Sequence, residues 1–327
     1  MRRVIREAAD RLLDLTVVPG YPRIGWGARR ALGLLEPVGT RLDGRVCVVT
    51  GATSGLGEEA AGQLAELGAT IVLVGRSEER LAAAHDAVAA RATGGGVETV
   101  VIDLASLDSV RHGAGVILEF HPEIHALVNN AGVLLDSRQE SADGFELTFA
   151  TNVLGPFLLT ELLIGALEAG AEASGEPSRI VSVSSGGMYT AAVHLDDLQS
   201  ERDDGWSGSG VYARTKRMQL MLTEVWARRL AASGVTANSM HPGWADTPGV
   251  QDSLPAFHRV MGPALRTPAE GADTVTWLVA DPEGGQTSGA FWHDRGRRPA
   301  VLLPGTAPQP GDAERLAVAC RQMAGLG

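Results

Sequence analysis

Residues 45–57 read Arg-Val-Cys-Val-Val-Thr-Gly-Ala-Thr-Ser-Gly-Leu-Gly, an apolar run that leads directly into a glycine-rich turn. A short run that is almost continuously apolar is typical of a strand covered on both faces of a parallel sheet. Glycines let the backbone turn tightly and approach a phosphate group where the next helix begins. Such turns are also common for steric reasons alone. The position of this one, between a strand and a helix, is what favours a cofactor site.

The pattern that this stretch opens continues along the chain. Short apolar runs alternate with longer stretches of helical periodicity, which predicts strand–helix–strand units with right-handed crossovers. The predicted strands are Arg45–Thr50, Thr70–Gly75, Val97–Ile102, His125–Asn129, Arg179–Ser184, Val235–Met240 and Ala290–His293. The predicted helices include Gly55–Leu67, Arg80–Ala90, Val211–Ala232 and Ala269–Ala280. We therefore expect an α/β fold built on a doubly wound parallel β-sheet, the Rossmann fold.

The chain divides into three parts. Residues 1–43 form an N-terminal extension, residues 44–298 a single Rossmann-fold domain, and residues 299–327 a Pro- and Gly-rich tail with a short predicted helix at Asp312–Met323. Within the extension, apolar spacing predicts an amphipathic helix over Arg2–Leu15. An irregular connector is predicted after it, marked by Pro19, Gly20, Pro22, Gly25 and Gly27.

The extension also differs from the rest of the chain in charge. The first 44 residues of the chain hold eight Arg against five acidic residues, a net charge of +3, whereas the whole chain carries −11. We expect the apolar face of its helix to pack on the main body. Contact of residues 1–44 with an anionic membrane surface is the alternative, since basic amphipathic helices bind such surfaces.

The overall composition excludes several classes of protein. With 44% hydrophobic and 20% charged residues, the chain is predicted to be globular and cytoplasmic. Its negative charge argues against nucleic acid as a partner, because binding phosphates needs a basic surface. Its two cysteines support no disulfide framework. No metal site is predicted, and no apolar stretch is expected to reach the roughly 18 residues of a membrane span.

The rarest residue types indicate where a site lies. There is one lysine, Lys216, against 27 arginines, and there are four asparagines: Asn129, Asn130, Asn152 and Asn238. Lys and Asn codons both begin with AA, so we infer a G+C-rich gene in which Arg replaces Lys wherever it can. Lysine then survives where its compact, titratable ammonium cannot be replaced by a flat guanidinium. Chance survival would not place it four residues after one of only three tyrosines.

Tyr212 and Lys216 are the first candidates for catalysis. At i and i+4 they share one face of a predicted helix, where the ammonium is expected to lower the phenol pKa from about 10 towards working pH. Such a phenol acts as a general acid for carbonyl reduction or a general base for alcohol oxidation. Ser185, after the fifth predicted strand, offers a hydroxyl to hold the carbonyl oxygen. Asn152 lies inside a helical pattern, where it is either a kink-former or a functional donor.

Three further strand ends offer cofactor contacts. Arg76 follows the second strand, at the place where an acidic residue would favour NAD(H). Its guanidinium suits a 2′-phosphate, so we expect NADP(H) to be preferred over NAD(H); an exposed Arg at the start of the next helix is the alternative. Asp103 and Leu104 end the third strand, where an acid can meet the adenine amino group. Asn130 follows the fourth strand, and its side chain either ties adjacent loops together or contributes to the site.

Together these motifs resemble those of the short-chain dehydrogenase/reductase family, from about Gly44 to His293. The resemblance implies a catalytic set of Asn152, Ser185, Tyr212 and Lys216. It implies that the cofactor is bound by Gly51, Thr53, Ser54, Gly55, Leu56, Gly57, Arg76, Asp103, Leu104, Asn130, Ala131, Gly132, Tyr212, Lys216, Pro242, Gly243 and Thr247. By the same resemblance Lys216 holds the nicotinamide ribose and Thr247 the nicotinamide amide, while Asn152 helps to hold a water in a proton relay.

One interval departs from what is common in the family. Ser185 and Tyr212 are 27 residues apart, which is longer than usual and resembles the interval of retinol-dehydrogenase-like members. The longer interval affects the segment between these two residues, which would form the substrate lid, and does not affect the catalytic set. Arg214 also replaces a small residue, and we expect it to affect packing or a homo-oligomer contact.

These observations predict an NADP(H)-dependent oxidoreductase acting on a small carbonyl or alcohol, with Tyr212 exchanging the proton. A nucleotide-sugar epimerase or dehydratase would share Tyr-x-x-x-Lys, but the chain lacks a long C-terminal substrate domain. A dinucleotide-sensing binding protein is the other alternative, although a sensor has no need of a tuned phenol. Five side chains expected to flank Tyr212 suggest a lipophilic substrate, unless they merely close the core: Met188, Trp206, Trp244, Phe257 and Met261.

Overall fold

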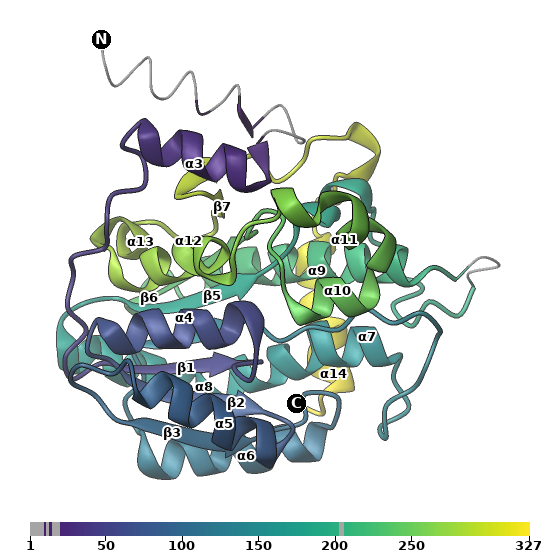
Figure 1. Ribbon diagram of the computed structural model, residues 1–327. Helices are drawn as coiled ribbons and strands as arrows, with labels where there is room; N and C mark the ends of the chain where they lie inside the picture. Colours follow the sequence, from purple (N-terminus) through teal and green to yellow (C-terminus); the bar gives the residue numbers. More distant parts are fainter. Residues whose placement is uncertain (1–9, 11–12, 15–19, 203–205) are drawn as a thin grey trace.

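The computed structural model describes the chain except for residues 1–9, 11–12, 15–19 and 203–205 (Figure 1). Its centre is one eight-stranded sheet with the order β3-β2-β1-β4-β5-β6-β7-β8, in which neighbouring strands are parallel except for β7 and β8. The strands are β1 (Val46–Thr50), β2 (Thr70–Gly75), β3 (Val97–Val101), β4 (Ala126–Asn129), β5 (Ser178–Val183), β6 (Val235–Met240), β7 (Phe291–His293) and β8 (Gly296–Arg298). The predicted doubly wound parallel sheet is confirmed.

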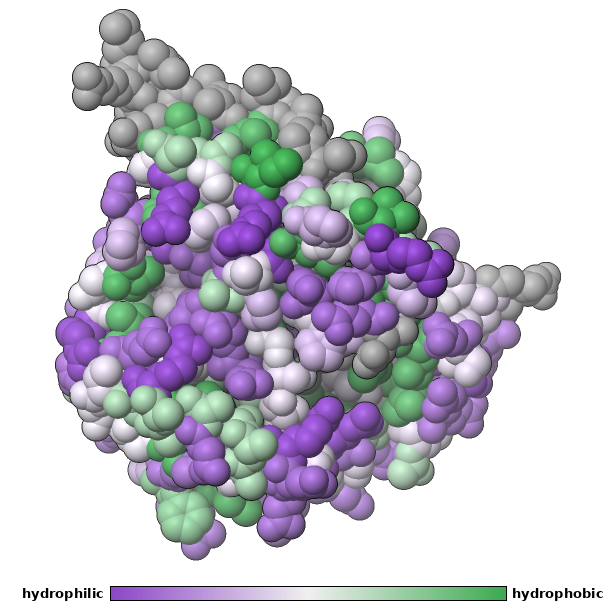
Figure 2. Space-filling model, viewed as in Figure 1, coloured by the Kyte–Doolittle hydropathy of each residue, from purple (hydrophilic) through white to green (hydrophobic). Residues whose placement is uncertain are grey.

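Helices cover both faces of this sheet. One face carries α4 (Gly55–Glu66), α5 (Glu78–Ala89) and α12 (Pro268–Ala280), and the other carries α6 (Leu107–Phe120), α8 (Gly155–Ser174) and α9 (Gly208–Arg229). Successive strand residues point to opposite faces, so Val48 joins one core and Val49 the other, both fully buried. Figure 2 shows hydrophilic and hydrophobic residues interspersed over the outer surface of α4 and α5.

The long helices that the sequence predicts are confirmed. The largest difference is at α9, which begins and ends three residues before the predicted Val211–Ala232, because Ser207 caps it through a hydrogen bond from Gly210 N. The remaining helices are α3 (Arg23–Ala31), α7 (Leu147–Phe149), α10 (Pro248–Ser253), α11 (Pro255–Met261), α13 (Pro282–Gln286) and α14 (Asp312–Met323). α14 has the predicted bounds, and its Leu316 and Cys320 are fully buried in the core beside α8 and α9.

The connector predicted after residue 19 is wrong, because most of it is helical. α3 includes Gly25 and Gly27, although glycine in a helix interior costs about 0.5–1 kcal/mol relative to alanine. The helix buries Gly25 and Arg29 against the rest of the fold, and this packing outweighs the local preference. The amphipathic helix predicted over Arg2–Leu15 lies largely outside the described residues, so its apolar face stays a prediction.

Strand β8 is also absent from the sequence-based expectations. Its Gly-Arg-Arg sequence lacks an apolar run, and it pairs with β7 through a turn at Asp294 and Arg295. Both turn residues have positive φ, 49° and 59°, which non-glycine residues adopt uncommonly. The turn therefore depends on contacts that these side chains make elsewhere in the fold.

One continuous helical stretch, Leu147–Ser174, is long and apolar enough to cross a membrane, with a mean hydropathy of 1.5. The expectation that no apolar stretch reaches this length is therefore wrong. In the structure 72% of its most apolar window is buried, and α8 packs against the sheet and α6. The stretch serves as a core helix of this fold.

The strand order reverses between β1 and β4. β2 and β3 follow on one side of β1, whereas β4, β5 and β6 follow on the other. In open α/β sheets, ligands bind outside the carboxyl ends of the strands at such a reversal. The predicted site residues lie at these strand ends or on the helices that follow them.

Candidate active site

The glycine-rich turn between β1 and α4 is shaped to let a phosphate approach its backbone. Gly51 has φ +64°, and a Cβ on Gly57 would lie 2.3 Å from Gly51 O and 2.4 Å from Asn130 Nδ2. Ser54, the N-cap residue of α4, makes no side-chain cap hydrogen bond within the described chain. Free N–H groups at a helix N-terminus favour an anion, so this cradle fits the pyrophosphate of a dinucleotide.

Asn130 supports the turn from the end of β4. Its Nδ2 donates to Thr50 O at 2.9 Å and to Gly51 O at 3.3 Å, while the backbone N–H groups of Asn130 and Ala131 donate to Thr50 Oγ1. The predicted alternative that this asparagine ties adjacent loops together is therefore confirmed. These hydrogen bonds fix the shape of the turn.

The other predicted adenosine-side residues lie at the ends of β2 and β3. Arg76 is exposed directly after β2, and Ser77 caps α5 by accepting a hydrogen bond from Arg80 N at 3.3 Å. The half-buried Asp103 accepts one from Ala105 N at 2.9 Å. Leu104 is only 6% exposed and its side chain belongs to the core, so only its backbone can face the site.

Helix α9 brings Tyr212 and Lys216 together beside the end of β5. Lys216 Nζ lies 5.4 Å from the centroid of the Tyr212 ring and donates to Val183 O at 2.9 Å. Ser185 is the second residue after β5 and caps the 3-10 helix Gly186–Thr190 by accepting from Gly187 N. Ser185 also hydrogen-bonds the Tyr212 side chain. Three of the four predicted catalytic side chains thus meet at one place.

Burial dominates the electrostatics of this pair. It raises the pKa of Tyr212 to about 12, and the hydrogen bond from Ser185 opposes the shift. Burial also lowers the pKa of Lys216 to about 7. The expected lowering of the phenol pKa by the ammonium is therefore wrong. The ammonium points to Val183 O, and desolvation of the phenol outweighs its influence.

Asn152 holds the loop after β4 in place beside the pair. It lies in a π-helix, Ala150–Leu154, which confirms the predicted irregularity. Its Oδ1 accepts from Val133 N at 2.7 Å, and its Nδ2 donates to Val133 O and to Thr215 Oγ1, each at 3.0 Å. Gly132 lies in this loop, and a Cβ there would be 3.2 Å from Lys216 Nζ.

Sequence reasoning missed the partner of the Asn152 backbone. Gln219 Nε2 donates to Asn152 O at 2.7 Å, and Gln219 is only 5% exposed. Its position three residues after Lys216, on the same helix face, was the available signal. The Asn152 carbonyl therefore already accepts a hydrogen bond from this side chain.

The loop after β6 closes the site from the other side. Thr247 caps α10 and lies against the glycine-rich turn, because a Cβ on Gly55 would be 3.3 Å from Thr247 Cβ. Gly243 has φ +74°, and a Cβ there would lie 2.5 Å from Arg266 Cζ and 2.6 Å from Tyr21 O. Tyr21 and Arg266 are site neighbours that the sequence alone did not reveal.

The five side chains expected to flank Tyr212 divide into two groups. Met188 is fully buried in a small core with Tyr189 and Phe291, so it closes the core. Trp244 and Phe257 meet edge to face, with ring centroids 5.2 Å apart, and both are half-buried. Trp206 and Met261 are also half-buried.

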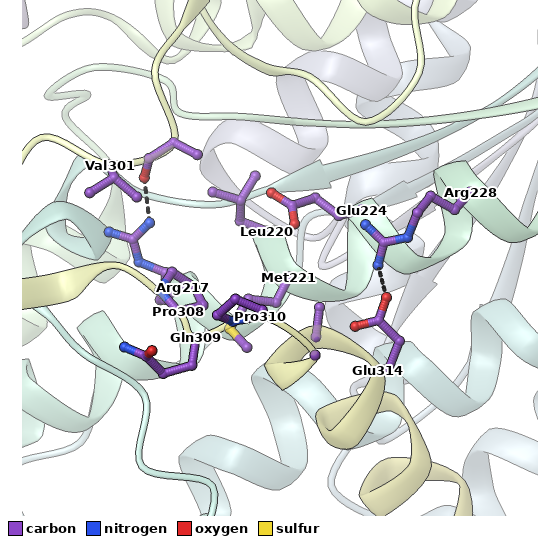
Figure 3. A pocket seen from close by; sticks show the side chains of 13 residues that line it. Arg217, Leu220, Met221, Glu224, Arg228, Val301, Pro308, Gln309, Pro310 and Glu314 are labelled. Atoms are coloured by element: carbon purple, nitrogen blue, oxygen red, sulfur yellow. Dashed lines mark hydrogen bonds and ion pairs between the residues drawn. The ribbon is translucent and has the colours of Figure 1, made fainter.

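A separate pocket of about 340 Å³ lies on the far side of α9 (Figure 3). It is lined by Arg217, Leu220, Met221, Glu224 and Arg228 of this helix and by residues 300–301, 308–311, 313 and 314. None of the predicted site residues lines it. Within the described ranges, no three His, Cys, Asp or Glu side chains are grouped to hold a metal ion.

Comparisons with known proteins agree with this arrangement. The family model for short chain dehydrogenases matches residues 45–195. Dehydrogenase/reductase SDR family member 12 from Bos taurus is 37% identical over 298 residues, which are 90% of this chain and 91% of the bovine protein. Retinol dehydrogenase 14 from Homo sapiens is 35% identical over 272 residues, 77% of this chain and 79% of the human protein.

Among solved structures, an uncharacterized protein from Mycobacterium paratuberculosis matches with a TM-score of 0.69 and 28% identity, covering 88% of this chain and 95% of that one. Residues 184–188, 197–202 and 240–249 also predict a resemblance to family member 12, and the bovine match confirms it.

Proposed function

The chain belongs to the short-chain dehydrogenase/reductase family of oxidoreductases, and we propose that it uses NADP(H) to interconvert a lipophilic carbonyl compound and its alcohol. The observation that carries the proposal is the meeting of Ser185, Tyr212 and Lys216 beside the glycine-rich turn. A dinucleotide held in that turn would extend along the carboxyl ends of the strands towards Tyr212.

The Tyr212 phenol is in the protonation state that carbonyl reduction requires. With a pKa of about 12, the Tyr212 phenol is protonated at neutral pH, the form that can donate to a carbonyl oxygen. Ser185, which hydrogen-bonds the phenol, is placed to hold the same oxygen. Lys216 has a pKa of about 7 and so can exchange a proton near neutral pH.

The bound cofactor supplies the hydride, and the other tasks fall to this chain. Tyr212 gives its proton to the carbonyl oxygen that Ser185 positions. Asn152 fixes the loop through Val133 and fixes α9 through Thr215, which keeps Gly132 against the Lys216 ammonium. Positioning of this kind lowers the barrier by holding the reacting groups in register.

Cofactor choice is assigned to Arg76. Its exposed guanidinium directly follows β2, where it can pair with a 2′-phosphate. Hydrogen bonds to a charged group supply about 2–3 kcal/mol, or roughly 30- to 150-fold in affinity. We therefore expect NADP(H) to bind more tightly than NAD(H) by this factor.

The substrate class is inferred from two aromatic side chains on the segments that follow β6 and from one relative. Trp244 and Phe257 present a half-buried aromatic pair beside the loop after β6. Retinol dehydrogenase 14, a relative at 35% identity, is named for a lipophilic alcohol. An apolar aldehyde or ketone therefore fits this site better than a sugar.

Steady-state NADPH oxidation with a panel of apolar aldehydes and polar sugar carbonyls tests the proposal. We expect turnover with apolar substrates, a lower KM for NADPH than for NADH, and reversal of this preference in Arg76→Asp. Nucleotide binding without turnover of any substrate would instead indicate a sensing protein. Equal affinity of the unmodified chain for NADH and NADPH would show that the role of Arg76 is wrong.

A further inference from the structure

The segment just before α3 contacts the loop that follows β6. Trp244 N donates to Tyr21 O at 3.1 Å, and the lack of a side chain on Gly243 lets the two backbones meet. On its other side the loop pairs with residue 266, because Arg266 N donates to Trp244 O and Asp246 N to Arg266 O, both at 2.8 Å. Residues 242–247 thus lie between two backbone contacts, one of which comes from the N-terminal extension.

Three buried charged side chains hold this contact: Arg29 on α3, Arg266, and Asp294 on the β7–β8 turn. We call them the N-terminal clamp. Arg29 donates to Asp294 at 2.7 Å, and Arg266 donates to both Asp294 oxygens, at 2.5 and 2.8 Å. The three residues are 0%, 1% and 5% exposed. Burial raises the pKa of Asp294, but the two guanidiniums outweigh it and hold the pKa below its usual value.

Other donors of the clamp go to backbone carbonyls on both sides of the contact, and Arg29 Nε also donates to Asp10 Oδ1 at 2.7 Å. Arg266 donates to Gly20 O at 3.1 Å and to Pro22 O at 3.4 Å, and also to Pro242 O at 3.2 Å. Arg29 donates to Gly20 O at 2.9 Å. Arg266 therefore bonds the N-terminal segment and the loop after β6 with a single side chain.

The Tyr21 ring extends this contact to the catalytic turn. A Cβ on Gly186, the residue after Ser185, would lie 2.8 Å from Tyr21 Cε2. The ring also packs on His241 and His293, with centroids 4.6 and 5.0 Å away. Burial holds the pKa of both histidines well below the usual value, so they are neutral fillers here. The segment thus touches the Ser185 turn and the loop that reaches Gly55 through Thr247.

We propose that the N-terminal clamp positions residues 242–247 against the glycine-rich turn, and that Arg266 is a positioning residue for cofactor binding. The inference rests on the proposed function, because it assigns the clamped loop to the nicotinamide cofactor. Buried ion clusters contribute little net stability relative to well-packed apolar side chains. What Arg266 provides is geometry, because its planar fork bonds Asp294 and three carbonyls at once.

The test uses the full chain and three variants. Arg266→Lys keeps the charge beside Asp294 but cannot reach all three carbonyls, and Arg29→Met removes the other arm of the clamp. Arg30→Met is the matched control, because Arg30 neighbours Arg29 on α3 but is exposed and packs over Trp26. Kd for NADPH by titration calorimetry, KM and kcat, and circular dichroism are measured for each.

We expect Kd and KM for NADPH to rise about 10- to 150-fold in Arg266→Lys and Arg29→Met, as the loss of one charged hydrogen bond would give. Arg30→Met should match the unmodified chain. A purely structural clamp would lower the folded fraction, and with it kcat, while KM stayed unchanged. Unchanged Kd and KM in folded Arg266→Lys overturns the inference. If the unmodified chain binds no nicotinamide nucleotide, the proposed function fails, and the inference fails with it.

Discussion

The glycine-rich turn and the N-terminal clamp hold opposite sides of the same site by different means. The turn achieves close contact by leaving side chains out, so that Gly51, Gly57 and the Asn130 amide pack backbone against backbone. The clamp achieves it with large side chains, in which two guanidiniums share one buried carboxylate. The turn is formed by eight consecutive residues, whereas the clamp joins Arg29 to Asp294, which are 265 residues apart in the sequence.

This difference shows which kind of site contact can be recognised from the sequence and which cannot. A turn made of glycines is a local signal with a known geometric reason. A clamp made of arginines has no local signal, particularly in a chain with 27 of them. The sequence thus gives no sign that the N-terminal extension contacts the turn after Ser185, although Tyr21 packs against Gly186 in the structure.

The largest expected effect is on catalysis at Tyr212, which lies in neither region. Tyr212→Phe removes the transferable proton, and kcat should fall by about 10²- to 10⁴-fold while Kd for NADPH stays unchanged. Tyr189→Phe is the matched control, because that buried phenol donates to Pro299 O at 2.8 Å, away from the predicted site residues. The control should lose stability but keep its kcat. A near-normal kcat in Tyr212→Phe would show that Tyr212 is not the general acid.

Deleting residues 1–31 should have the next largest effect, on stability. Asp294 then loses Arg29, and breaking a buried ion pair costs about 3–5 kcal/mol of unfolding free energy. Urea unfolding of the full and truncated chains measures the difference. Equal stability, together with salt-sensitive binding of only the full chain to anionic liposomes, would favour the membrane alternative instead.

Two glycine-to-alanine substitutions add the same methyl group to each region and are expected to have opposite effects on stability. Gly57→Ala places a Cβ 2.3 Å from Gly51 O, so it should cost about 1–3 kcal/mol and weaken NADPH binding. Gly27→Ala, in α3, places a Cβ with nothing within 4 Å, so it should stabilise the protein by about 0.5–1 kcal/mol. Thermal unfolding of both variants measures the contrast. Similar behaviour of the two would mean that the turn is not tightly packed.

Much of the fold follows from local sequence patterns. β2 and β6 have the predicted bounds. The run of β2 is continuously apolar and ends at Gly75, whereas β6 contains Asn238 and ends before the turn at Pro242 and Gly243. Helix α3 was missed because Gly25 and Gly27 read as breakers, and only tertiary packing of Arg29 reveals why the segment is helical. β8 was missed for the related reason that arginines form it.

The site residues also divide into those that local sequence patterns predict and those that only the structure shows. Tyr212, Lys216 and Ser185 were found from rarity and spacing, and the structure brings them together. The predicted effect of Lys216 on the phenol was wrong, because spacing does not tell how deeply a pair is buried. Tyr21, Gln219 and Arg266 were missed because their partners lie on other elements.

The single lysine is proposed to mark a buried proton-transfer site, and its own titration is the most direct test. A chain labelled with [ε-¹³C]lysine should give one lysine resonance, and its titration in the cofactor-free protein reports Lys216 directly. Burial predicts an apparent pKa of about 7, against 10.5 for an unperturbed lysine. Between these values the unfolded chain holds a proton that the folded chain has released. The contribution of Lys216 to the unfolding free energy should therefore rise with pH over this range. A resonance that titrates near the unperturbed value would show that the lysine is exposed, and would contradict the claim.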